Sequence, residues 1–317
     1  MRQSKAATVT DPLVLISHPM LAPLQPALEQ AGLKARRAWA FDEADRPRVR
    51  AILHAGEFVL TPEFLGGFPN LGLIAVVSAG YDGVDVAWCR ARGIEVTHAA
   101  GVNAEDVADH AMGLLVAGWR DLAGGDRVVK EGRWRTEDRL APQPSLTGRR
   151  LGIFGLGHIG RAVARRAEGF RLQVSWWGPN DKPTPWSRAE DLLALAEASD
   201  ILMIACRGGA ETRGLVNREV IEAVGPAGMI VNVSRGSVID EDALIEALKA
   251  GRLWRAALDV FEAEPTPAAR WADVPGVLLT PHRAGGTTEG IPRLLAQAVD
   301  NVQRFLEGQP VTSPVPG

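Results

Sequence analysis

The chain has 317 residues, of which 46% are hydrophobic and 23% are charged. These proportions are typical of folded, water-soluble globular proteins and argue against collagenous, coiled-coil or largely disordered chains. The formal net charge of −3 supplies no overall basic field, so we expect neither nucleic acid nor an anionic membrane as a partner. Because a single hydrophobic core rarely grows beyond roughly 250–300 residues, the length predicts two domains.

Targeting signals, disulfides and metal sites are not indicated by the sequence. The apolar run at residues 13–16 is too short for a signal-peptide core or a membrane span. Cys89 and Cys206 lie far apart and have no C-x-x-C partner, which argues against a cysteine zinc cluster and against a disulfide framework. We therefore expect a cytoplasmic protein that binds no metal.

The first hundred residues alternate short β-like apolar runs with stretches of helical period, which is typical of an α/β sheet. We expect strands near residues 13–17, 51–53, 74–77 and 94–96, and helices around residues 23–31 and 84–92. A longer helix is expected to begin at Asn103, a residue type that favours N-caps, with Asp106 three positions on, and to run to about Trp119.

From residue 151 the alternation becomes regular and predicts a second, larger sheet. The expected strands are 151–154, 172–176, 201–204, 229–233, 256–260 and 277–279. Six strands joined by right-handed crossovers form the doubly wound sheet that binds dinucleotides.

A last helix follows this sheet and has an apolar face. Its apolar positions are Ile291, Leu294, Leu295, Ala298, Val302 and Phe305, and Gly308 and Pro310 end it. If this helix packs back on the N-terminal unit, residues 1–101 and 286–317 form one domain, and residues 102–285 form a second domain inserted into it. Clefts suited to ligands occur at such junctions.

A glycine-rich segment, Gly155-Leu-Gly157-His-Ile-Gly160, directly follows the first strand of the larger sheet and opens a helix. In such a loop the first glycine makes a tight turn, and the second lets the backbone approach a pyrophosphate. The third lets the helix pack closely on the strand, and the helix N-terminus faces the anion. The alternative is a purely structural turn, but the strand before it and the helix after it favour dinucleotide binding.

The choice between NAD and NADP depends on the end of the second strand of this sheet. An acid that binds the ribose of NAD is expected about 20 residues beyond the first glycine, but residues 174–180 contain no carboxylate. An acid there would repel a 2′-phosphate, whereas Asn180 and Lys182 could donate hydrogen bonds to one. We therefore expect NADPH. The alternative is that Asp181 turns inward and NAD is used.

Charged residues follow the fourth, fifth and sixth strands, at the edge where open α/β sheets bind ligands. A reversible hydride transfer to a carbonyl needs a proton donor with a pKa near neutrality, which points to His282. Glu264 would orient that ring and favour its charged form, and Arg235 offers a planar fork of donors for a substrate carboxylate. The structural alternatives are a surface ion pair for Arg235, a solvated loop acid for Glu264 and a turn residue for His282. Asp259 either binds the nicotinamide amide or caps the following turn.

Four motifs, in this order, resemble the D-isomer-specific 2-hydroxyacid dehydrogenases, particularly the glyoxylate/hydroxypyruvate reductase branch. They are the glycine loop and residues 232–240, 257–265 and 280–282. The resemblance implies two doubly wound α/β domains, a Rossmann dinucleotide-binding domain inserted into a smaller flavodoxin-like substrate domain. It also implies a 2-oxoacid reductase and a homodimer formed through the cofactor domain.

The resemblance assigns roles to individual residues. The catalytic residues are Arg235, Glu264 and His282. The substrate-binding residues are Ser78, Ala79 and Gly80, which would bind a carboxylate through backbone N–H groups, together with Arg235 and His282. The cofactor-binding residues are Gly155, Gly157, His158, Ile159, Gly160, Trp177, Cys206, Val233, Ser234, Arg235, Asp259, His282 and Gly285. Asn103 would open the helix at the hinge.

Several features leave alternatives open. Trp177-Gly178 replaces the aspartate of NAD-using members, and Arg283 follows the histidine where an aliphatic residue is frequent. A dinucleotide-sensing, non-catalytic corepressor remains the alternative function. Formate dehydrogenase-like chemistry is disfavoured, since that branch pairs its histidine with glutamine. Among the other histidines, a loop that overhangs the cleft is one option for His54, and His110 is expected to be a polar packing residue.

Overall fold

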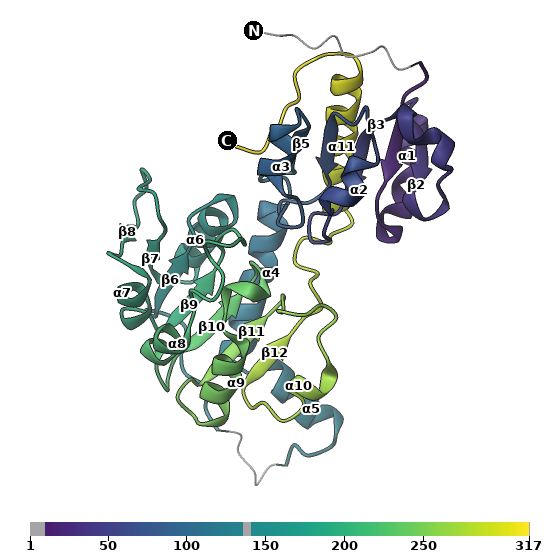
Figure 1. The fold of residues 1–317 in the computed structure, drawn as a ribbon. Coiled ribbons are helices and arrows are strands. Elements are labelled where there is room, and N and C mark those ends of the chain that lie inside the picture. Colours follow the sequence, from purple (N-terminus) through teal and green to yellow (C-terminus); the bar gives the residue numbers. More distant parts are fainter. Residues whose placement is uncertain (1–9, 136–140, 317) are drawn as a thin grey trace. The chain divides into compact units, whose positions relative to one another are not determined.

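The structure is a computed structural model that describes residues 10–135 and 141–316. The chain divides into two compact units. The first comprises Met1–Asn103 and Thr288–Gly317, and the second comprises Ala104–Thr287. Each unit contains one parallel sheet with helices packed against it, as Figure 1 shows. Within the described residues, no helix combines the length and the apolar character that crossing a bilayer requires.

The first unit has a parallel sheet of five strands in the order β2-β1-β3-β4-β5. The strands are β1 (Leu13–Ile16), β2 (Lys34–Arg37), β3 (Val49–His54), β4 (Leu73–Val76) and β5 (Glu95–Thr97). Strands β1 and β4 are buried along their whole length, as expected of parallel strands that are covered on both faces. This strand order is the flavodoxin-like one, which confirms the predicted fold of the smaller unit.

Short helices connect these strands. They are α1 (Gln25–Gln30), α2 (Pro62–Gly66) and α3 (Val86–Ala91), with 3₁₀ turns at Pro19–Leu24, Ala38–Ala40 and Glu43–Arg48. The helix expected at 23–31 is a 3₁₀ turn followed by α1. The helix expected at 84–92 begins only at Val86, because the Asp85 side chain caps it by accepting a hydrogen bond from the Trp88 N–H, 2.9 Å away.

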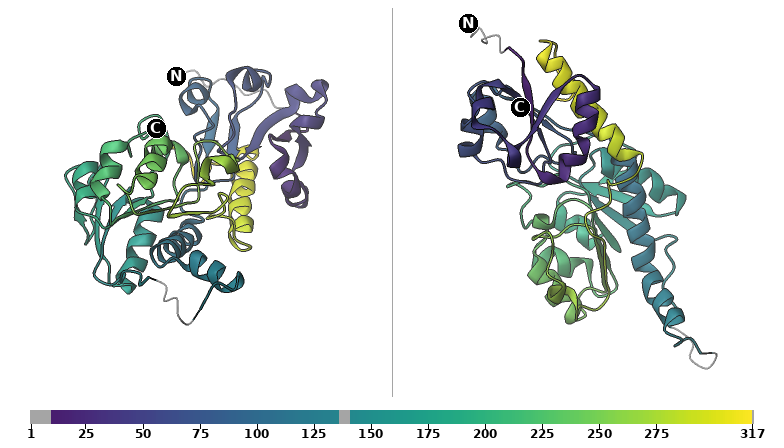
Figure 2. Two further views of the ribbon diagram at one scale, coloured as in Figure 1. Left: turned by 90° about the horizontal axis from the view of Figure 1, so that it is seen from below. Right: turned by 90° about the vertical axis from the view of Figure 1, so that its right-hand side faces the viewer.

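The last helix, α11 (Gly290–Leu306), packs on the sheet of the first unit. Leu294, Ala298 and Val302 are buried among residues of the central strands, and the yellow helix lies along this sheet in both views of Figure 2. The Phe305 ring lies against Gly72, where an added Cβ would come within 2.5 Å of it. Ile291 was expected on the same apolar face, but 47% of it is exposed.

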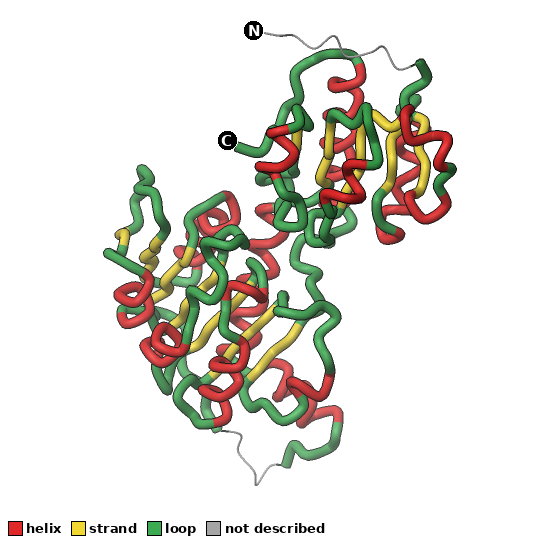
Figure 3. The backbone as a smooth tube through the Cα atoms, in the orientation of Figure 1, coloured by secondary structure: helices red, strands yellow, loops and turns green. Residues whose placement is uncertain are grey.

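The second unit has seven parallel strands in the order β12-β11-β10-β9-β6-β7-β8, drawn in yellow in Figure 3. They are β6 (Arg150–Phe154), β7 (Gln173–Trp177), β8 (Ser187–Arg188), β9 (Ile201–Ile204), β10 (Met229–Asn232), β11 (Arg255–Leu258) and β12 (Val277–Leu279). The prediction of six strands missed β8, whose two residues are polar and exposed. Strand β8 takes the outer position beside β7, and β9 pairs with β6 on the side opposite β7.

Helices cover both faces of this sheet. They are α4 (Ala104–Trp119), α5 (Leu122–Lys130), α6 (His158–Gly169), α7 (Leu192–Glu197), α8 (Arg218–Val224), α9 (Glu241–Lys249) and α10 (Ala268–Trp271), with a 3₁₀ turn at Gly236–Val238. Helices α4 and α6 share one core with Ile201 and Met203 of β9. Helices α7, α8 and α9 share the other core with Leu202 and Ile204, because alternate residues of a strand face opposite sides.

Helix α4 has the predicted length but not the predicted cap. Its 16 residues end at Trp119, as the apolar pattern indicates. The Oδ1 atom of Asn103 is buried and has no hydrogen-bond partner among the described residues, so the expected side-chain cap is not formed. Glu105 and Asp106 in the first turn still favour this helix end, since carboxylates stabilise the positive end of the helix dipole.

His54 ends β3 and is buried, so it does not lie in an exposed loop, which was one option from the sequence. Its Nε2 donates to the Phe58 carbonyl oxygen at 2.9 Å, and its Nδ1 lies 2.8 Å from the Ser17 hydroxyl. Burial lowers the pKa of His54 to about 4, because the buried ring disfavours a charge. The native protein therefore holds this ring neutral.

The stability of the protein should fall as the pH is lowered from about 6.5 to about 4. In this range the unfolded chain protonates His54 and the native state does not, so acid favours unfolding by on the order of 3 kcal/mol. Urea unfolding of the wild type and of His54→Gln at several pH values checks this. The wild type should lose more stability than the variant across this range. Equal pH dependence of the two proteins would contradict the assignment.

Candidate active site

Three charged side chains lie together beyond the carboxyl ends of β10, β11 and β12. Nδ1 of His282 lies 2.5 Å from Oε2 of Glu264. The guanidinium of Arg235 is close enough to influence the pKa values of both. The second unit thus brings together the three residues predicted to be catalytic, although no contact between them could be read from the sequence.

The hydrogen bonds leave one nitrogen of His282 available. Oε1 of Glu264 accepts from the Phe261 N–H at 2.9 Å, and Oε2 lies against Nδ1 of His282. Both carboxylate oxygens are therefore engaged, which fixes the orientation of the ring. Within the described residues, Nε2 of His282 has no hydrogen-bond partner. The side chain of His282 is 34% exposed, so this nitrogen is accessible to a ligand.

The pair is also tuned electrostatically. The hydrogen bond to Glu264 raises the pKa of His282 above its usual value and outweighs burial, which lowers it. Burial alone would raise the pKa of Glu264, but its hydrogen bonds with His282 and with the Phe261 N–H hold that pKa below its usual value. The carboxylate therefore stays charged and the imidazole holds a proton more readily, as a proton donor near neutral pH requires.

The backbone of His282 adopts a left-handed conformation, with φ of 45°. This region is uncommon for a non-glycine residue and costs on the order of 1–3 kcal/mol. Asp259 holds the segment, since its carbonyl oxygen accepts from the His282 N–H at 2.8 Å. Its carboxylate accepts from the Arg283 N–H at 3.0 Å, from the Ala284 N–H at 2.9 Å and from the Thr280 hydroxyl at 2.5 Å.

Asp259 therefore makes the contacts of the structural alternative, in which it caps the turn after β12. It is 1% exposed, and its carboxylate accepts hydrogen bonds from three groups of that turn. This leaves its predicted binding of the nicotinamide amide untested. The participation of Thr280 could not be predicted from the sequence, because a threonine before proline has many possible roles.

Arg235 is presented by a turn that Asn232 organises. The fully buried Asn232 donates from Nδ2 to the Arg235 carbonyl at 3.0 Å and accepts from the Ser234 N–H at 3.0 Å. At Gly236 an added Cβ would lie 1.8 Å from the Phe261 carbonyl carbon, so only glycine allows this approach. This close approach places Arg235 beside the segment that carries Glu264. Asn232 belongs to the motif at residues 232–240, but the sequence did not predict that it positions the turn of Arg235.

The glycine loop fits a dinucleotide pyrophosphate. Gly155 has φ of 99°, and an added Cβ at Gly160 would lie 2.1 Å from the Gly155 carbonyl oxygen. At Gly157 an added Cβ would meet nothing within 4 Å, so the backbone borders open space. Helix α6 begins there with no side-chain cap, which leaves the N–H groups of His158 and Ile159 for an anion.

The remaining predicted cofactor residues line the ends of neighbouring strands. The Trp177 ring packs on Phe154 with centroids 5.3 Å apart, and the Gly155 N–H donates to the Trp177 carbonyl at 2.8 Å. Ser234, which follows Val233, donates from its hydroxyl to the Cys206 carbonyl at 2.5 Å. Burial raises the pKa of the Cys206 thiol to about 12, so this thiol stays protonated. Gly285 lies in the turn after Ala284.

The predicted carboxylate-binding residues belong to the first unit. The Ser78 hydroxyl donates to the Gly80 carbonyl at 2.8 Å and accepts from the Gly56 N–H at 3.1 Å. An added Cβ at Gly56 would lie 1.9 Å from that carbonyl oxygen, so the two loops pack closely. The N–H groups of Ala79 and Gly80 have no acceptor among the described residues. Their binding of a substrate carboxylate stays a prediction.

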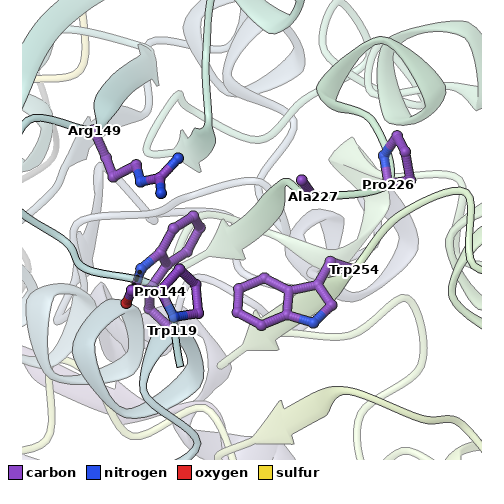
Figure 4. A pocket seen from close by; sticks show the side chains of 6 residues that line it. All are labelled: Trp119, Pro144, Arg149, Pro226, Ala227 and Trp254. Carbon is purple, nitrogen blue, oxygen red and sulfur yellow. Dashed lines mark hydrogen bonds between the residues drawn. The ribbon is translucent and has the colours of Figure 1, made fainter. Parts of the chain in front are cut away.

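A surface pocket of about 220 Å³ lies elsewhere in the second unit (Figure 4). It is lined by Trp119, Pro144, Arg149, Pro226, Ala227 and Trp254. Ala227 and Trp254 precede β10 and β11, so the pocket lies at the amino ends of these strands, away from His282. In the part of the chain that the structure describes, no group of three or more His, Cys, Asp or Glu side chains is placed to hold a metal ion.

Comparisons with known proteins point to one family. Residues 112–284 match a family model described as the NAD binding domain of D-isomer specific 2-hydroxyacid dehydrogenases. A hydroxyphenylpyruvate reductase from Plectranthus scutellarioides is 36% identical over 93% of this chain and 97% of its own length.

Solved structures of similar proteins cover nearly the whole chain. A 2-hydroxyacid dehydrogenase from Ketogulonicigenium vulgare is 41% identical over 97% of this chain and 99% of that chain, with a TM-score of 0.88. An NADPH-dependent glyoxylate/hydroxypyruvate reductase from Sinorhizobium meliloti, in complex with NADP and malonate, is 35% identical over 96% of this chain and 97% of that chain, with a TM-score of 0.89. The chain therefore belongs to the D-isomer specific 2-hydroxyacid dehydrogenase family, and it is an oxidoreductase that uses a nicotinamide dinucleotide.

Proposed function

We propose that this protein reduces small 2-oxoacids of the glyoxylate and hydroxypyruvate kind to D-2-hydroxyacids. The observation that carries the proposal is the 2.5 Å contact between His282 and Glu264, beside Arg235 and with Nε2 of His282 left for a substrate. A named reductase of these substrates is similar over nearly the whole chain, which supports the substrate class.

Each side chain has a separate task in the proposed reaction. Bound NAD(P)H supplies a hydride to the carbonyl carbon of the 2-oxoacid. Nε2 of His282 gives its proton to the carbonyl oxygen, so that a hydroxyl forms. Glu264 holds the ring and stabilises its charged form before transfer. Arg235 binds the substrate carboxylate through its planar fork of donors and draws electron density from the adjacent carbonyl.

The test is turnover of the purified protein on a panel of 2-oxoacids, with glyoxylate and hydroxypyruvate included and NADPH and NADH each supplied. Rapid consumption of the reduced dinucleotide with formation of the D-hydroxyacid is the expected result. Tight dinucleotide binding without turnover on any 2-oxoacid would overturn the proposal and favour a dinucleotide-sensing corepressor.

We also propose that the enzyme prefers NADPH. Strand β7 ends without a carboxylate, and the side chain of Asp181 accepts a hydrogen bond from the Lys182 N–H at 2.9 Å. Nζ of Lys182 donates to the Leu156 carbonyl of the phosphate loop at 2.8 Å. Burial and the nearby charge of Arg161 lower the pKa of Lys182. Lys182 and Arg161, two basic side chains beside the phosphate loop, would stabilise the 2′-phosphate of NADPH.

Lys182→Met should raise KM for NADPH by about tenfold and leave KM for NADH nearly unchanged, since a charged hydrogen bond contributes about 1.5–3 kcal/mol. Steady-state kinetics with each dinucleotide measure this. Asp181→Asn is the matched control, because it should change neither KM if Asp181 does not bind a ribose. A loss of NADH turnover in Asp181→Asn would instead indicate an NAD enzyme.

We also propose that the enzyme is a cytoplasmic homodimer. Helix α5 has no buried residue within this chain, and its Leu122 and Val129 are 54% and 57% exposed. Apolar residues on an uncovered helix favour contact with a second copy. We propose the first unit as the substrate domain and the second as the cofactor domain.

A further inference from the structure

We infer that helix α4 holds the segment bearing His282 through two side chains, His110 and Asp106, and that His110 is a positioning residue for the reaction. The inference rests on the proposed function in that His282 is the proton donor. His110 has no role assigned by the sequence beyond polar packing.

His110 contacts the segment where it leaves the sheet. Its Nε2 lies 3.0 Å from the Thr280 hydroxyl and 3.3 Å from Oδ1 of Asp259. The Thr280 hydroxyl donates its single proton to Asp259, at 2.5 Å, so its oxygen is left to accept from His110. Nε2 of His110 must therefore carry a hydrogen. His110, Thr280 and Asp259 form a hydrogen-bonded chain from the helix to the catalytic turn.

Asp259 depends on these donors. It is 1% exposed, and among the described residues His110 is the only basic side chain within 4 Å of its carboxylate. A buried carboxylate that loses a hydrogen-bond donor is destabilised, because water cannot replace the donor. The same carboxylate accepts from the N–H groups of Arg283 and Ala284. Loss of the His110 donor should therefore weaken the hold of Asp259 on the backbone at Arg283 and Ala284.

A second contact holds the far end of the segment. The Thr287 hydroxyl donates to Oδ1 of Asp106 at 3.0 Å. Asp106 and His110 are four residues apart, so they lie on the same face of α4. The helix contacts the start and the end of the stretch 280–287, and His282 lies between the two contacts.

Helix α4 is a rigid support for these contacts. Its apolar face, which includes Val107, Ala111 and Leu115, is buried in the same core as Ala284. The segment needs such support, since His282 keeps a left-handed backbone conformation that an unrestrained chain would leave. Without the His110 contact we expect the imidazole to sample orientations from which Nε2 misses the carbonyl oxygen.

The first test uses a pair of variants. His110→Phe keeps a ring of similar size but loses the donor, and His110→Gln keeps an N–H group near the position of Nε2. His110→Phe should lower kcat about tenfold, as loss of one hydrogen bond predicts, with KM for the 2-oxoacid and for the dinucleotide within about twofold of wild type. His110→Gln should recover most of the lost kcat.

Thr280→Val provides an independent check of the chain of contacts. It removes the hydroxyl that links His110 to Asp259, so it should lower kcat by a similar factor. The double variant His110→Phe/Thr280→Val should then be no slower than either single variant by more than about twofold, since coupled residues are not additive. If the two losses of kcat multiply in the double variant, His110 and Thr280 do not act through one hydrogen-bonded chain.

Amide hydrogen exchange in the cofactor-free protein gives a readout that does not depend on activity. The N–H groups of Arg283 and Ala284 should exchange at least about tenfold faster in His110→Phe, whereas Met203 in β9 should keep wild-type protection. A general loss of stability would instead accelerate Met203 as well, and it would assign His110 a structural role only.

The outcomes separate the two proposals. Wild-type kcat together with unchanged protection of Ala284 in His110→Phe would overturn the inference, even if His282 proves essential. A wild-type protein that turns over no 2-oxoacid would overturn the proposed function, and the exchange experiment would still decide whether His110 holds the turn.

Discussion

Replacing His282 with alanine should lower kcat by about 10²–10⁴, which is the usual contribution of a general acid or base. In the proposed reaction Nε2 of His282 protonates the substrate oxygen, and Glu264 raises the pKa of His282, so that the ring more readily carries the proton to be given at neutral pH. Steady-state kinetics of the variant with the best 2-oxoacid measure the loss.

The same variant should bind NADPH almost as tightly as the wild type does, because the phosphate loop around Gly157 lies on other strands. Fluorescence titration of the free protein checks this. Wild-type turnover in His282→Ala would reject the role of the histidine. A large loss of dinucleotide affinity would show that the variant damages the cofactor site rather than proton transfer.

Exchange of Arg235 for lysine should raise KM for the 2-oxoacid by about 10–100-fold. The guanidinium offers a planar fork that donates two parallel hydrogen bonds to a carboxylate, whereas an ammonium is a point charge with different geometry. Loss of one charge-assisted hydrogen bond, at about 1.5–3 kcal/mol, gives a factor of this size. The assay is the dependence of rate on 2-oxoacid concentration at saturating NADPH.

Arg283→Lys is the matched control for this exchange. Arg283 follows His282, the residue that we propose as the proton donor, but the Arg283 side chain forms no ion pair among the described residues. The Arg283→Lys variant should therefore keep KM for the 2-oxoacid close to the wild-type value. If Arg235→Lys also keeps the wild-type KM, the assignment of Arg235 as the carboxylate anchor is wrong. If Arg283→Lys alone raises KM, the anchor lies one residue beyond His282.

The strands near the centre of each sheet could be predicted from the sequence because they are buried on both faces. Such strands are continuous apolar runs, as in β9 (Ile201–Ile204). The edge strands β2 and β8 could not be predicted in this way. Three of the four residues of β2 are charged and exposed, and β8 consists of one serine and one arginine. Without β8, the expected count of six strands was wrong.

That Arg235, Glu264 and His282 lie together could be predicted, because strand ends in open α/β sheets collect at one edge. The residues that hold them could not. His110 and Thr280 are 170 positions apart, and their contact depends on how α4 packs on the sheet. Asn232 and Asp259 are polar residues at strand ends, and sequence alone does not say whether such a residue faces a ligand or its own turn.

The close packing of Gly236 on Phe261 limits which positions can be changed to alter the substrate preference of the enzyme. Because the two loops touch through their backbones, a side chain added at Gly236 would displace Phe261 and the segment that carries Glu264. Efforts to make the enzyme accept bulkier acids should therefore leave this junction intact. They should diversify other positions, where a new side chain displaces solvent rather than main-chain atoms.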